Sequence, residues 1–265
     1  MSRPAVAAHA DFGASAHLYE KRAPYAQRVF SCLQQYVGAA PGVTQVADIG
    51  AGTGNFTRLL AAAGLHGQAV EPDARMRAEA ARLLGNHAFT WIDGTAEQTG
   101  LPSSSIDWLC VSTSFHLMDA PCALQEFARV LRPAGHLTIV WKLREIGDDP
   151  LMNRIEMLIA SMAPGLDRLY EQALDTIACL EDSVKANGCF ADCLHIDAPH
   201  EEVLSRDDYV AIWRSAEEIQ SQVGPVRWRD ILAAIDDLVP RQSHITALHR
   251  THAWTFRRAG EGTRS

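Results

Sequence analysis

The sequence lacks any apolar run long enough to span a membrane. Its first ten residues are rich in alanine, but they are too short, and too interrupted by Arg3 and Pro4, to form a signal peptide. We therefore expect a cytoplasmic protein without a membrane partner.

Basic residues are also scarce: 24 Lys and Arg stand against 32 Asp and Glu, so the formal net charge is −8. The densest basic cluster, Arg227 and Arg229, is interrupted by Trp228 and followed by Asp230. A surface of this sign repels phosphate backbones. We expect no nucleic-acid partner.

The few cysteines form no recognisable framework. Six are scattered along the chain, which is typical of buried free thiols in a reducing compartment. Cys189, Cys193 and His195 lie close together, but their spacing matches no common zinc site and no second ligand pair follows. We expect no metal.

What the sequence does contain is an alternation of strand and helix patterns. The 265 residues are 47% hydrophobic, enough for one large domain with a packed core. The first half predicts strands at 43–49, 68–70, 88–92, 106–112 and 136–142, and helices at 23–36, 56–64, 74–84 and 121–131. The second half predicts helices at 150–163, 166–187, 205–222 and 225–238, and strands at 189–198 and 244–256. Such alternation implies an α/β fold with a parallel sheet covered on both faces, and ligands bind beyond the carboxyl ends of its strands.

A glycine-rich turn follows the first strand in the stretch Asp48-Ile-Gly-Ala-Gly-Thr-Gly54. Dinucleotide-binding turns place a third glycine where this chain has Asn55. The Asp48 carboxylate would repel a pyrophosphate but attract an ammonium group. S-adenosylmethionine carries that ammonium and no phosphate, so the turn favours this methyl donor as the cofactor, with S-adenosylhomocysteine as its product.

Glu71 ends the second strand, nineteen residues after Gly52. This is the reach at which a carboxylate accepts both ribose hydroxyls of an adenosine bound over the turn. The ribose role does not discriminate against NAD, and the alternative is a solvated loop acid.

Five motifs in order complete a pattern: Asp48 to Gly54, Glu71-Pro-Asp, Gly94-Thr-Ala-Glu97 with Leu101-Pro102, Phe115-His116, and Arg129-Val-Leu-Arg-Pro-Ala-Gly135. Together they resemble the class I S-adenosylmethionine-dependent methyltransferases of the type 11 group, over about Tyr19 to Trp141. The resemblance implies a Rossmann-like, seven-stranded, mostly parallel sheet with helices on both faces and a last strand that runs antiparallel. The pattern of the C-terminal half indicates that it completes this sheet and adds a helical cover over the site. We then expect a single domain: lid helices at 1–40, a donor-binding core at 41–142, an acceptor-side helical cover with one strand at 143–243, and the final strand at 244–258.

The resemblance also implies donor contacts along the chain. Asp48, Gly50 and Gly52 would line the methionine end and Glu71 the ribose, while Pro72 and Met76 would pack near the adenine. Thr95, Ala96 and Glu97 would flank the adenine edge. Many relatives carry an Asp at or near Thr95, so Asp93 or backbone groups would substitute here.

Two further groups would surround the sulfonium. Ser112 and Ser114 would border it from the fourth strand. Tyr19 would face its positive charge and Arg22 would meet the donor's carboxylate, unless this segment is an ordinary amphipathic helix start.

The acceptor side is less defined. His116 is the candidate general base; alternatively it only shapes the pocket or caps the following helix. Trp141 and Trp213 are candidate acceptor contacts, with core packing as the alternative. We expect methylation of an oxygen or nitrogen, with carbon as a third option, of a small molecule, and we favour a natural product.

Two other functions stay open. An NAD-dependent oxidoreductase uses the same turn and ribose acid, although Asp48 and Asn55 oppose it. A catalytically silent protein that only binds the donor is the other.

Overall fold

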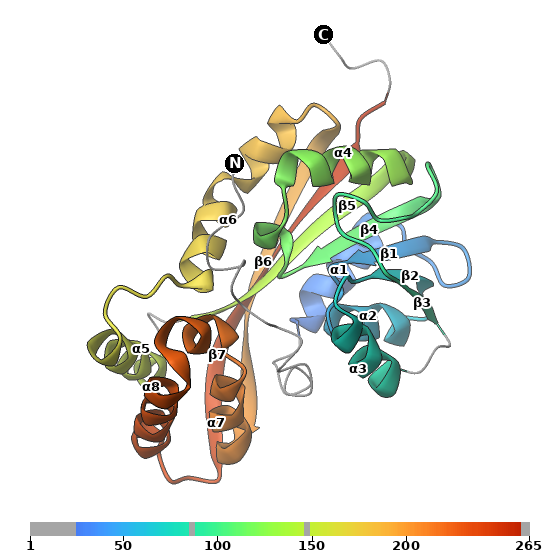
Figure 1. Cartoon of the computed structure of the whole chain (residues 1–265). Helices are drawn as coiled ribbons and strands as arrows, with labels where there is room; N and C mark the ends of the chain where they lie inside the picture. The colour runs from blue at the N-terminus through green and yellow to red at the C-terminus, as the bar shows by residue number, and fades with distance from the viewer. Residues whose placement is uncertain (1–24, 85–87, 146–148, 261–265) are drawn as a thin grey trace.

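The central feature of the computed structural model is one seven-stranded sheet in the order β3-β2-β1-β4-β5-β7-β6 (Figure 1). Residues 25–84, 88–145 and 149–260 are described. The strands are β1 Gln45–Ile49, β2 His66–Val70, β3 Phe89–Ile92, β4 Ile106–Ser112, β5 Leu131–Arg144, β6 Phe190–Ser205 and β7 His244–Arg258. The first five pair in parallel, whereas β7 is antiparallel to both β5 and β6. The expected Rossmann-like sheet is confirmed, including its antiparallel last strand.

Strand order reverses between β1 and β4, which are neighbours in the sheet although β2 and β3 lie between them in sequence. In sheets of this type the ligand crevice opens at that point, outside the carboxyl ends of the strands. Those ends carry the glycine turn after β1 and the segment after β4.

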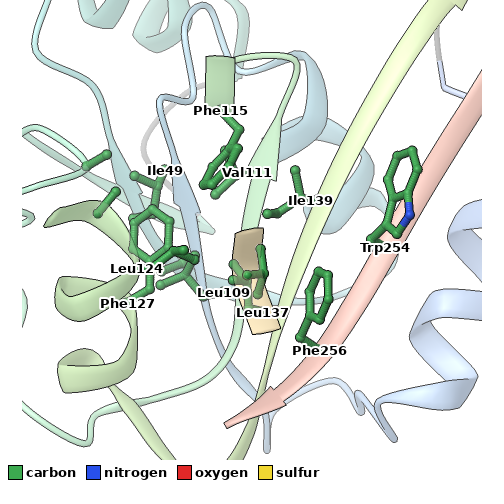
Figure 2. Close-up of a cluster of buried hydrophobic side chains, with 14 of the residues drawn as sticks. Ile49, Leu109, Val111, Phe115, Leu124, Phe127, Leu137, Ile139, Trp254 and Phe256 are labelled. Atoms are coloured by element: carbon green, nitrogen blue, oxygen red, sulfur yellow. The ribbon is translucent and has the colours of Figure 1, made fainter. Parts of the chain in front are cut away.

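Helices cover both faces of the sheet. They are α1 Gln27–Tyr36, α2 Asn55–Ala62, α3 Ala74–Leu84, α4 Ala120–Val130, α5 Pro150–Met162, α6 Leu169–Ala186, α7 Arg206–Arg214 and α8 Glu217–Leu238, with a short 3-10 helix η2 at Phe115–Leu117. Strand side chains alternate between the faces, so Val46 packs with α1 and α2 while Ala47 packs with α4 and α6. Figure 2 shows the second of these cores, where Leu124 and Phe127 of α4 meet the strand residues.

The three strands β5, β7 and β6 are much longer than the others and continue past the parallel part of the sheet. On this extension α5, α7 and α8 bury a separate apolar cluster with Ile245 and Ala247 of β7. We call α5, α7, α8 and the ends of these strands the outer lobe (Figure 1). The helical cover expected from the C-terminal half is thus divided: α6 lies on the sheet and the other three helices form the lobe.

Two predicted elements of the second half were wrong in extent. The helix expected at 205–222 is divided between α7 and the first part of α8. The break expected between 222 and 225 is confirmed, since α8 is interrupted at Gly224, which has a φ of +78° and precedes Pro225. Glycine adopts that φ without steric cost, and proline suits the first turn that follows. The strand expected to end at residue 198 continues to Ser205, because residues 199–205 pair with β7 along its first half.

The N-terminal region is described only from residue 25. Within it α1, which falls in the expected lid at 1–40, packs Val29, Phe30 and Leu33 against the sheet. The fourfold division of the chain stays a prediction. Across the described ranges, no helix is both long and apolar enough to cross a membrane.

Candidate active site

The turn after β1 requires its glycines. Gly50, Gly52 and Gly54 have φ values of +66°, +58° and +83°, a region that other residues rarely adopt. A Cβ added at Gly50 would lie 2.7 Å from Ser114 Oγ, whereas one at Gly52 would meet nothing within 4 Å. The turn is therefore closely packed at Gly50 and open at Gly52, where a ligand can approach the backbone.

Glu71 lies over this turn, as the sequence predicted. Its carboxylate accepts hydrogen bonds from Gly52 N and Asp73 N, each 2.9 Å long, although the residue is only 8% exposed. Burial raises the pKa of Glu71, and these backbone bonds and Arg77 oppose the rise. Each carboxylate oxygen can accept further bonds, which suits a pair of ribose hydroxyls.

Asp48 is fully buried at the end of β1. Thr57 Oγ1 donates a 2.6 Å hydrogen bond to its Oδ2, but Oδ1 has no partner in the described chain. Burial raises the pKa of Asp48 to about 7, and the charge of Glu71 adds to the rise. A buried carboxylate oxygen without a partner is costly, so an ammonium group of a ligand would stabilise it.

The expected adenine side is partly occupied by the protein itself. Met76 and Ala96 are buried there as expected, and Pro72 is exposed. Glu97 Oε1 accepts a 2.8 Å bond from Asp119 N, so this carboxylate fixes the segment before α4.

The two alternatives for the missing adenine carboxylate differ in availability. Asp93 is exposed and pairs with Arg77 at 3.0 Å. Thr95 N already donates to Gln98 O. Backbone groups at 96 and 97 are therefore the better candidates for an adenine contact.

Sequence reasoning missed a contact between Thr113, which follows β4, and Tyr25, which precedes α1. Thr113 has a φ of +54°, its N–H donates to Val140 O, and its Oγ1 lies 3.0 Å from the Tyr25 hydroxyl. Ser112 ends β4, and Ser114 Oγ donates a long bond to Ile49 O. A tyrosine before the first helix was visible in sequence, but nothing there indicated its partner 88 residues away.

His116 lies in η2, beside this segment. Burial lowers the pKa of His116 to about 4, and its Nδ1 has no hydrogen-bond partner among the described residues. Its ring centroid is 6.3 Å from that of Trp141, which is fully buried and whose Nε1 also lacks a described partner. The Asp119 carboxylate, not His116, caps α4 by accepting from Cys122 N. Of the roles considered for His116, helix capping is wrong.

Trp213 is not brought together with Trp141. It lies in the core of the outer lobe, whereas Trp141 belongs to the core under α4 and α6. Tyr19 and Arg22 lie outside the described residues.

The cysteines are all free, but only Cys110 is buried, and Cys32, Cys122 and Cys179 are exposed. The expectation that the thiols are buried was therefore wrong for half of them. In the described part of the chain no group of three or more His, Cys, Asp and Glu side chains could hold a metal ion.

The strand order and the glycine turn with its two carboxylates are typical of a Rossmann-like fold. Residues 47–139 match the family model described as a methyltransferase domain, of the type 11 group. Over these residues the chain is similar to the class I S-adenosylmethionine-dependent methyltransferases of this group.

Similar proteins carry the same domain. An uncharacterized methyltransferase of Mycobacterium tuberculosis is 35% identical over 127 residues, 43% of this chain and 51% of that protein. The chain thus matches about half the length of such curated relatives.

Two solved structures share the fold. A protein of Anaeromyxobacter dehalogenans, described as a type II methyltransferase, superimposes with a TM-score of 0.54 at 19% identity, covering 89% of this chain and 96% of that one. The phosphoethanolamine N-methyltransferase 2 of Haemonchus contortus, solved with S-adenosylhomocysteine, gives 0.53 at 14% identity over 94% and 58%.

Proposed function

We propose that this protein transfers the methyl group of S-adenosylmethionine to an oxygen, nitrogen or carbon atom of a small molecule, with a natural product as the favoured acceptor. One observation carries the proposal: a buried carboxylate with an unpartnered oxygen, Asp48, and a ribose-type carboxylate, Glu71, flank an open glycine turn. The structure from Haemonchus contortus was solved with S-adenosylhomocysteine, which supports the same cofactor here.

The residues around the turn fit the donor's functional groups. Asp48 Oδ1 would accept from the ammonium, the Glu71 carboxylate would accept from the ribose hydroxyls, and Met76 would pack against the adenine. The same Asp48 oxygen argues against a nicotinamide dinucleotide, because a buried carboxylate would repel its pyrophosphate. When bound, S-adenosylmethionine supplies a methyl group on a positively charged sulfur.

His116 is the proposed proton acceptor. Its buried imidazole is neutral at pH 7, since its pKa is lowered to about 4, and Nδ1 has no hydrogen-bond partner among the described residues. Nδ1 would orient an O–H or N–H acceptor and take its proton as the bond to the methyl carbon forms. The low pKa makes this imidazole a weak base, so orientation of the acceptor would supply much of its effect. Trp141 Nε1–H, buried beside it, would donate a hydrogen bond to the methyl acceptor.

The test is formation of S-adenosylhomocysteine from S-adenosylmethionine across a panel of alcohols, phenols, amines and carboxylic acids. We expect turnover with at least one acceptor class. His116→Gln should lower kcat by about 10²- to 10⁴-fold if His116 accepts the proton. A mere rise in KM would assign it to pocket shape, and donor binding without any turnover would support the catalytically silent alternative.

A further inference from the structure

A second group of polar side chains lies where the outer lobe meets the sheet, and the reaction above does not use it. It consists of Lys142 and Arg144 of β5, His249 of β7, and Tyr209 and Trp213 of α7. We call these five residues the lobe cluster. The Arg144 guanidinium lies over the rings of Tyr209 and Trp213, and both Lys142 and Arg144 act electrostatically on His249. The cluster is therefore continuous across three elements.

Arg144 is held in place without an acidic partner. Its Cζ lies 5.4 Å from the centroid of the Tyr209 ring and 5.0 Å from that of Trp213, so aromatic rings orient the guanidinium. One of its N–H groups donates to Met152 Sδ at 3.1 Å. Within the described ranges no carboxylate lies at salt-bridge distance from Arg144. A planar guanidinium carries further N–H donors, and their fixed geometry suits a planar oxyanion.

Buried donors surround the same place. Trp213 Nε1, the hydroxyl of the fully buried Tyr209 and His249 Nδ1 make no hydrogen bond of standard geometry in the described structure. The nearest groups are within the cluster itself: burial raises the pKa of Tyr209, and hydrogen bonding from Arg144 and Trp213 opposes the rise. Burial, Lys142 and Arg144 together lower the pKa of His249 to about 2, so its ring is neutral. Each unsatisfied buried donor costs free energy until an acceptor atom arrives.

Two carboxylates face the lobe cluster, and neither satisfies these donors. Glu202 of β6 is half-buried; burial raises its pKa, Lys142 and Arg144 lower it, and its Oε2 has no partner in the described residues. Asp149 acts on Tyr209 electrostatically, but its carboxylate caps α5 by accepting from Leu151 N and Met152 N. The cluster is consequently rich in donors and poor in acceptors.

The lobe cluster begins at the edge where methyl transfer would occur. Val140 of β5 pairs with Ser112 at the end of β4, and Lys142 and Arg144 follow two and four residues later on the same face. At about 3.3 Å per residue they lie roughly 7 Å and 13 Å beyond that edge. Lys142 Nζ is 5.6 Å from the ring centroid of Tyr25, whose hydroxyl contacts Thr113.

We infer that the methyl acceptor carries a carboxylate or phosphate group, which Arg144 binds together with the N–H of Trp213 and the hydroxyl of Tyr209. The reacting atom would then lie on the order of 10 Å from this group, given the extended strand between them. This inference rests on the proposed function, because it names the substrate class for the same site.

Calorimetric titration of the full chain saturated with S-adenosylhomocysteine tests it with matched probes. Phenylacetate and phenylacetamide differ only in charge, and phenyl phosphate distinguishes a phosphate site from a carboxylate site. We expect one anion to bind at least about tenfold more tightly than the amide. Arg144→Gln should remove this preference and leave the affinity for S-adenosylhomocysteine unchanged.

Arg214→Gln is the control, since it removes an exposed charge from α7, the helix that carries Tyr209 and Trp213. It should preserve the preference for the anion. If Arg144→Gln fails to fold, Trp213→Phe is the second variant, because it keeps an aromatic ring at Arg144 and deletes the indole N–H. It should lower the affinity for the anion at least about threefold.

Three results would overturn the inference, provided that S-adenosylhomocysteine still binds: equal affinity for acid and amide, binding of neither, or a preference for the anion that survives Arg144→Gln. Failure to bind S-adenosylhomocysteine at all would instead overturn the proposed function and this inference with it.

Discussion

Replacing Asp48 by Asn should stabilise the protein in a pH-dependent way. The folded state raises the pKa of Asp48 from 3.8 to about 7 by burying it. The contribution of the protonated Asp48 carboxyl to the free energy of unfolding is therefore fully present below pH 3.8 and is lost as pH rises to 7. At about 1.36 kcal/mol per pKa unit, ionisation costs the native protein roughly 4 kcal/mol above pH 7.

Asparagine imitates the protonated carboxyl at this site. Its amide oxygen can accept the hydrogen bond from Thr57. Its NH₂ group takes the place of Asp48 Oδ1, which has no partner in the described chain, so the NH₂ is left without an acceptor at a cost of about 1–3 kcal/mol. The variant should be about 1–3 kcal/mol more stable than the wild type at pH 8.5. This advantage should shrink by about 2–3 kcal/mol at pH 5, because only the wild type titrates between these values.

Urea unfolding at pH 5, 7 and 8.5 measures this difference. Asp93→Asn is the control: its carboxylate is exposed, so its replacement should change stability by a few tenths of a kcal/mol and equally at each pH. A difference between Asp48→Asn and wild type that is the same at all three pH values would refute the account of a buried, unsatisfied carboxylate.

Three further predictions follow from the site and the lobe cluster. Binding of S-adenosylhomocysteine should weaken up to about tenfold per pH unit below 7, since Asp48 must lose its proton to meet the ammonium; calorimetry across pH 5.5–8 checks this. Gly50→Ala should lower the free energy of unfolding by about 1–3 kcal/mol and the affinity for S-adenosylhomocysteine at least about tenfold, because the residue has a φ of +66° and its Cβ would lie 2.7 Å from Ser114 Oγ. Gly52→Ala, whose Cβ would meet open space, should lose less stability when both variants are unfolded with urea. Because the folded pKa of His249 is depressed to about 2, only the unfolded state binds this proton as pH falls below the unfolded value near 6.5; stability should therefore fall by about 1.4 kcal/mol per unit, and His249→Gln should flatten the acid limb of stability against pH.

Much of the sheet could be predicted because its signals are local. The α3 and β4 boundaries coincide with the predicted segments, since apolar periodicity and the glycines that end the elements lie within a few residues. The far end of β6 was missed, because residues 199–205 contain a proline and two consecutive glutamates. Pairing with β7, 39 to 51 residues further along the chain, makes them a strand.

The positions of the site residues could likewise be predicted only where the sequence signal is local. Glu71 was placed correctly because a strand, a glycine turn and a second strand fix its distance from Gly52. The bond from Asp119 N to Glu97 and the contact of Tyr25 with Thr113 depend on tertiary packing between distant segments. The same is true of Arg144 and its two aromatic rings, so the lobe cluster could not be read from the sequence.

The most direct test of the central claim is a calorimetric titration with S-adenosylhomocysteine, with NADH as the rival ligand, repeated on Glu71→Ala. The account predicts micromolar binding of S-adenosylhomocysteine, about −8 kcal/mol, which is lost in Glu71→Ala, and no binding of NADH. Binding of NADH without binding of S-adenosylhomocysteine would contradict it.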